Sequence, residues 1–104
     1  MFEPQYQLVV QVKSVRSVDF DWLVQWENDL AAQLAPSADV DGHDFGSGEF
    51  NIFILTSDPT ASFRKVQEFV AIHPLPNTMA AAYRQIDSDE YIVLWPPYSA
   101  GSIA

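Results

Sequence analysis

The sequence predicts an α+β fold, a two-layer sandwich in which two helices cover one face of an antiparallel sheet. Segments of alternating apolar and polar residues, typical of strands, are interspersed with two segments of helical apolar spacing. Clusters of turn-forming residues separate neighbouring strand segments, which indicates hairpins and antiparallel pairing. The chain has 104 residues, of which 48% are hydrophobic, and this suits one ordered domain with a single core.

The first strand is expected over residues 6–13, where the side chains alternate in polarity. The face expected to pack on the core consists of Tyr6, Leu8, Val10 and Val12, and the opposite face is mostly polar. Residues 14–18 would connect this strand to a helix.

The first helix is expected to begin at Asp19, which suits the N-cap position. Val18 and Leu23 are spaced as a hydrophobic staple, and Pro36 would end the helix. One stripe of helical spacing should face the core, with Glu27 as its only polar member: Phe20, Leu23, Val24, Glu27, Leu30, Ala31 and Leu34.

Trp22 and Trp26 lie one helical turn apart on the flank of this stripe. One interpretation places both at the rim of the core. The other makes them an exposed aromatic pair that anchors a partner, because tryptophans are enriched among the residues that dominate binding.

A β-hairpin is expected over residues 39–58, with Gly46-Ser47-Gly48 as its turn because these residues tolerate positive φ. With Phe45 and Glu49 flanking the turn, position 43 would lie opposite position 51. The first predicted face is polar near the turn and comprises Asp39, Asp41, His43, Glu49, Asn51, Phe53 and Leu55. The second is the predicted core face, with Asp44 as an exception, and comprises Val40, Gly42, Asp44, Phe50, Ile52 and Ile54.

The second helix is expected to have Asp58 as its N-cap and Pro59 at its first helical position. It should end near His73-Pro74, with a loop over residues 75–77. Its buried stripe would comprise Phe63, Val66, Phe69 and Val70.

Two further strands are expected over residues 79–86 and 91–95, joined by a turn over residues 87–90. Pro96-Pro97 would end the sheet. A single domain would then span residues 1–97, and residues 98–104 would form a flexible tail.

The resulting order β-α-β-β-α-β-β predicts the split βαβ, or ferredoxin-like, βαββαβ arrangement with an extra C-terminal hairpin strand. Both helices would cover the same face of the sheet. The other face would be open to water or to a partner, and would carry Gln7, Val9, Gln11, His43, Asn51 and Phe53.

The net charge of −9 is distributed unevenly, because no Lys or Arg occurs between Arg16 and Arg64. This sign disfavours nucleic acids and anionic membranes, whose binding requires basic residues. It permits cations and basic protein partners. The alternative is that the acidic surface serves only solubility.

The N-terminal residues show no basic stretch followed by an apolar one, so no secretory signal is expected. No apolar run approaches the length that spans a bilayer. A cytoplasmic protein is therefore expected. Because the chain has no cysteine, disulfides and thiolate chemistry are excluded.

Residues 41–54 read Asp-Gly-His-Asp-Phe-Gly-Ser-Gly-Glu-Phe-Asn-Ile-Phe-Ile and are followed by Thr56-Ser57-Asp58-Pro59. This stretch resembles a group of small uncharacterised bacterial proteins that share the pattern DG-H-D-x-GSGE-x-N-IFI and the helix start after it. The resemblance implies a bacterial, cytosolic-type, ferredoxin-like domain. It implies no activity and no functional residue.

The Asp and His residues around the hairpin invite a metal interpretation. They do not form a calcium-binding EF-hand loop: counted from Asp39, the sixth position is Asp44 instead of glycine and the twelfth is Phe50 instead of glutamate. A site for Mg, Mn or Zn from Asp41, His43 and Glu49 needs all three on one face. Otherwise these residues form a solvated hairpin tip.

No catalytic group is predicted. His43 and Asp44 are adjacent in a strand and point to opposite faces, and Ser47 lies in a turn without the surroundings of a nucleophile elbow. An RNA-binding sheet would need basic and aromatic residues on its central strands, where Phe53 alone qualifies.

Three functional hypotheses follow. The leading one is a non-enzymatic, acidic, protein-binding domain without a cofactor, of inhibitor or immunity type, that recognises a basic partner. The second is a metal- or small-molecule-binding domain with its site on the Asp39–Asn51 hairpin. The third is a self-associating structural domain that forms a homodimer through its open sheet face. The candidate binding residues are Asp41, His43, Glu49, Asn51, Phe53, Trp22 and Trp26.

Overall fold

The structure is a computed structural model that describes residues 3–16, 19–75 and 78–96. The described chain forms five strands and two helices, as the sequence predicts. Their bounds are β1 Tyr6–Val12, α1 Phe20–Leu34, β2 Ala38–Gly46, β3 Glu49–Thr56, α2 Pro59–Ile72, β4 Met79–Gln85 and β5 Ile92–Trp95. The predicted tail over residues 98–104 lies outside the described residues.

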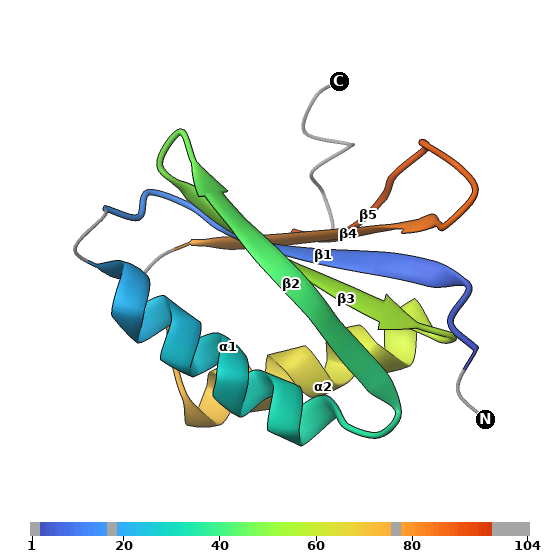
Figure 1. The fold of residues 1–104 in the computed structure, drawn as a ribbon, viewed down its shortest axis with the longest axis horizontal. Helices are drawn as coiled ribbons and strands as arrows, with labels where there is room; N and C mark the ends of the chain where they lie inside the picture. Colours follow the sequence, from blue (N-terminus) through green and yellow to red (C-terminus); the bar gives the residue numbers. More distant parts are fainter. Residues whose placement is uncertain (1–2, 17–18, 76–77, 97–104) are drawn as a thin grey trace.

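All five strands join one antiparallel sheet in the order β2-β3-β1-β4-β5. β1 is therefore central, and β2 and β5 are the two edges. Both helices lie on the same side of the sheet, so the fold is a two-layer α+β sandwich (Figure 1).

The core lies between the helices and the inward side chains of the central strands. The predicted core residues of β1 and β3 pair across the register as Leu8 with Ile54 and Val10 with Ile52, and all four are fully buried. Ala81 of β4 is buried opposite Val10, whereas Ala80 and Ala82 are partly buried on the other face of the sheet.

α1 buries most of the predicted stripe, including Leu23, Glu27, Leu30 and Leu34. Asp19 occupies the N-cap position, but its carboxylate accepts a hydrogen bond from the Arg16 amide, 3.1 Å away, and no bond from the helix. The predicted staple involves Val18, which lies outside the described residues.

α2 begins as the sequence predicts. The Asp58 carboxylate accepts from the amide of Ala61 at 3.0 Å, and Pro59 opens the helix. Phe63, Val66 and Phe69 are buried, whereas Val70 is only partly buried. The helix ends at Ile72, and the amide of the C-cap residue His73 donates to the carbonyl of Phe69.

The final hairpin joins β4 to β5 through a turn held by Arg84. The Nη1 atom of Arg84 donates to the carbonyl oxygens of Gln85, Ile86 and Ser88, at 3.1, 2.8 and 3.0 Å. Its Nε donates to Gln7 on the neighbouring strand at 3.1 Å. This arginine therefore fixes the turn against the open face of the sheet.

Candidate functional site

The hairpin adopts a register that differs by one residue from the predicted one. Ser47 and Gly48 form a two-residue turn with φ values of 55° and 76°, so that Gly46 pairs with Glu49 and His43 pairs with Ile52. The prediction that His43 lies opposite Asn51 is wrong. Ser47 adopts a positive φ itself, and this moves the turn by one residue relative to the strand that precedes it.

A β-bulge at Asp41 compensates for this shift further along β2. The register changes between Val40 and Gly42, and Gly42 has a φ of 155°. Beyond the bulge Val40 lies opposite Ile54 and remains partly buried against the core, as predicted. The extra residue thus places His43 and Val40 on the same side of the sheet.

His43 lies on the face covered by α1. Its Nδ1 atom is 2.6 Å from Oε1 of Glu27, and its ring stacks on Phe50 with 4.9 Å between centroids. Glu27 is only 5% exposed, and this imidazole is the one side-chain partner of its carboxylate among the described residues. The contact is a hydrogen bond when His43 is neutral and an ion pair when it is protonated.

The Glu27–His43 contact explains the two anomalies of the sequence pattern. Glu27 is the one polar member of the helix stripe because it bonds His43 across the sandwich. Asp44, predicted to intrude on the core face, instead lies on the open face, where it accepts from Asn51 at 2.9 Å. The polar residues Glu27, in the helix stripe, and Asp44, on the predicted core face, were the signal that could have shown the correct register.

The open face holds two of the predicted site residues in local hydrogen bonds. Glu49 accepts from Gln11 at 3.2 Å, and Asn51 donates to Asp44. The Oδ1 atom of Asn51 is buried and has no hydrogen-bond partner among the described residues. Phe53 is partly buried on β3, opposite Val9 on one side and Gly42 on the other.

The three residues considered for a metal site, Asp41, His43 and Glu49, do not share one face of the hairpin. His43 points to the helices, whereas Glu49 and Asn51 lie on the opposite face. No group of three or more His, Asp or Glu side chains within the described ranges is arranged to hold a metal ion. His43 is also absent from the open face on which it was expected.

The two tryptophans do not form an exposed pair. Trp26 is 4% exposed, its Nε1 donates to the carbonyl of His73 at 2.9 Å, and its ring contacts Phe69. Trp22 is 49% exposed. Trp26 thus belongs to the core and ties α1 to the end of α2, while Trp22 alone is open to a partner.

The acidic segment of the sequence forms one side of the molecule. β2 is an edge strand that lies beside α1 (Figure 1). Exposed carboxylates follow both elements, and they are Asp39, Asp41 and Asp44 on β2 and Asp21 and Asp29 on α1. The outer side of β2 pairs with no other described strand.

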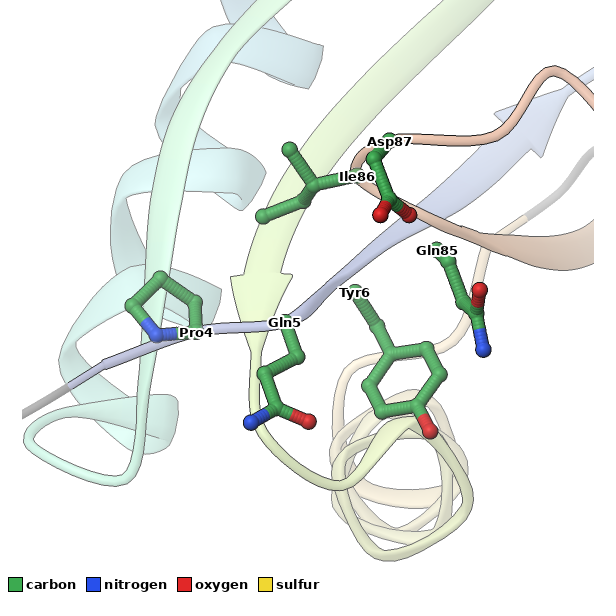
Figure 2. Close-up of a pocket in the computed structure, with 6 residues that line it drawn as sticks. All are labelled: Pro4, Gln5, Tyr6, Gln85, Ile86 and Asp87. Atoms are coloured by element: carbon green, nitrogen blue, oxygen red, sulfur yellow. The ribbon is translucent and has the colours of Figure 1, made fainter.

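A cleft of about 400 Å³ lies where β1 begins and β4 ends (Figure 2). Tyr6 and Gln85 pair across the two strands, and the amide of Ile86 donates to the carbonyl of Gln5 at 3.0 Å. The side chains around the cleft offer amide, phenol and carboxylate groups, from Gln5, Tyr6, Gln85 and Asp87. These groups can hydrogen-bond a polar ligand.

The sequence pattern does not reveal the surface at the other edge of the sheet. β5 pairs only with β4 among the described strands, and its neighbourhood exposes apolar side chains at Tyr91, Ile92, Val93 and Trp95. A groove of about 330 Å³ continues from this edge onto the open face, over the small side chains of Ala80 and Ala82. Finding this surface requires the strand order, which leaves β5 at an edge.

Comparison with protein-family models, with curated proteins and with solved structures finds no match. The resemblance of the hairpin to small bacterial proteins therefore stays a prediction. Within the described part of the chain, neither helix is long and apolar enough to cross a membrane.

Proposed function

We propose that this protein is a non-enzymatic protein-binding domain whose acidic β2 edge recognises a basic partner. An inhibitor or immunity protein of a basic toxin is the form of this proposal that fits a small acidic domain. The observation that carries it is the position of the acidic segment: it forms an edge strand whose outer side pairs with no other described strand.

Charge supports this choice of surface. The net charge is −9, and the chain from 17 to 63 contains no Lys or Arg to neutralise its carboxylates. Asp39 and Asp41 are exposed and make no side-chain hydrogen bond or ion pair with the described residues. A concentrated negative surface of this kind speeds the approach of a basic protein and favours it over acidic competitors.

Backbone geometry supplies the second support. β2 is 9 residues long and its inner side is already paired with β3. An extended segment of a partner could add to the outer side of β2 through main-chain hydrogen bonds, with its basic side chains beside the aspartates. The bulge at Asp41 would interrupt such pairing and so fix its register.

The proposal includes a relation to the ferredoxin-like, or split βαβ, fold. The first four strands lie in the order β2-β3-β1-β4, and one helix follows β1 while the other follows β3. This order supports the relation, with β5 as an additional edge strand. It would leave both the acidic edge and the sheet face opposite the helices open to partners.

The test is affinity capture. The purified chain is immobilised and exposed to an extract of its native host, and the bound proteins are then identified. The wild type should recover a basic protein in a stoichiometric amount. Asp39→Asn with Asp41→Asn should lose about tenfold in affinity for it, because two exposed charge pairs contribute up to about 1 kcal/mol each.

The control carries the same change of charge elsewhere. Glu68 and Asp87 are exposed on α2 and on the last turn, so Glu68→Gln with Asp87→Asn also removes two carboxylates. This control should retain the partner. An equal loss of affinity in both double variants would show that net charge alone, and not the β2 edge, determines binding. Capture of no basic protein would refute the proposal.

A further inference from the structure

The two edges of the sheet differ in chemistry. β2 carries three exposed aspartates, whose like charges would oppose pairing with the same strand of a second copy. β5 carries no charged residue, and Ile92, Val93 and Trp95 are 53%, 44% and 39% exposed. An apolar strand at an open edge is a surface on which another strand can pair.

The apolar surface of β5 extends beyond the strand. Tyr91, Val93 and Trp95 line the groove, and Val9 lies among the lining residues from β1. Trp95 lies at the rim, because its ring also contacts Phe63 of α2 with 6.4 Å between centroids. This continuity enlarges the apolar area that pairing along β5 would remove from water. It also sets the direction of the interface, along the edge and over the open face.

Charges lie at opposite ends of this surface. Asp89 and Glu90 are exposed and are separated from the start of β5 by Tyr91 alone. Lys13 is exposed and lines the groove together with Trp95, the last residue of β5. The surface is therefore acidic where the strand begins and basic where it ends.

We propose that a second copy of this chain pairs with β5 in antiparallel orientation, so that the two sheets join across a two-fold axis. Antiparallel pairing brings the acidic end of each copy toward the Lys13 end of the other. Parallel pairing would instead bring the acidic ends together. A two-fold axis also closes the assembly at two copies, because each β5 edge is then used. The surface is separate from β2, so the inference is independent of the proposed function.

Analytical ultracentrifugation of the purified chain over a wide concentration range tests the inference. The wild type should shift from the mass of one 11.7 kDa chain toward twice that mass as concentration rises. Val93→Lys should raise the dissociation constant at least tenfold, because it places a charge in the interface. Ile72→Lys is the control, since Ile72 is 69% exposed at the end of α2, and it should leave association unchanged.

Charge reversal tests the orientation. Lys13→Glu and Asp89→Lys should each weaken association, and the double variant should recover it at the wild-type net charge. Arg64→Glu, on the exposed side of α2, controls for the net charge of Lys13→Glu. Circular dichroism should show that all variants remain folded.

Three outcomes would overturn the inference. One is a wild type that stays at the mass of one chain throughout. Another is an association that Val93→Lys leaves unchanged, which would assign the contact to a different surface. The third is a double charge reversal that is weaker than both single variants, which would exclude the antiparallel arrangement.

Discussion

The Nδ1 atom of His43 lies 2.6 Å from Oε1 of Glu27 and joins the β2–β3 hairpin to the inner face of α1. Glu27 is buried, and His43 is also held by stacking on Phe50 and by an edge contact with Phe20. The pair therefore fixes the hairpin on the helix layer, and with it the direction in which the β2 edge faces.

Removing either member of this pair should destabilise the fold. Glu27→Ala leaves His43 without its partner, and His43→Ala leaves a buried carboxylate, so each should cost about 1–3 kcal/mol. Urea unfolding of both single variants and the double variant gives the coupling energy, which should fall in the range of about 0.5–3 kcal/mol. Additive losses would show that the contact contributes nothing.

Ile52→Ala should lower the free energy of unfolding by about 2–5 kcal/mol, because Ile52 is fully buried on β3. The exposed Val93 provides the control, and Val93→Ala should change stability by about 0.5 kcal/mol or less. Chemical denaturation measures both. A loss below about 1 kcal/mol at Ile52 would contradict its burial between the sheet and the helices.

Gly42→Ala should destabilise the chain through backbone strain alone. A Cβ at position 42 would meet no atom within 4 Å, but the residue has a φ of 155°. The expected cost is about 1–2 kcal/mol. Gly46→Ala is the matched control, because its Cβ also meets nothing within 4 Å and its φ lies outside the left-handed region. Equal thermal stability of the two variants would argue against the bulge.

Trp26→Phe should cost about 1 kcal/mol or more, because it removes the hydrogen bond from Nε1 to the carbonyl of His73 and some of the buried ring. Trp22→Phe should have almost no effect, since Trp22 is half exposed. Thermal unfolding compares the two. A larger loss at Trp22 would reverse the assignment of core and surface on α1.

The strands and helices could be predicted because their signals are local. The alternation in β1, the Asp58-Pro59 start of α2 and the turn before β5 each depend on a few neighbouring residues. Burial on β1 and β3 followed from the same alternation.

The hairpin register could not be predicted with the same success. Gly46, Ser47 and Gly48 permit either of two neighbouring turns, and the choice depends on the positive φ that Ser47 adopts. A shift by one residue exchanges the two faces of a strand, and this moved His43 from the predicted site to the helix layer. The bulge at Asp41 is likewise invisible in an alternating pattern.

The exposure of β5 and the burial of Trp26 depend on contacts that are distant in the sequence. β5 is an edge because β4 already pairs with β1 on its other side. Trp26 is buried because the end of α2 lies beside it, 47 residues further along the chain. Local patterns contain neither fact.

The most direct test of the acidic binding edge is a titration followed by amide chemical shifts in nuclear magnetic resonance. The probe is a synthetic peptide in which lysine alternates with threonine, and its control is the same peptide with glutamate in place of lysine. The proposed function predicts shifts that saturate along Ala38–Gly46 with the lysine peptide only. Shifts that avoid β2, or that are equal with both peptides, would contradict it.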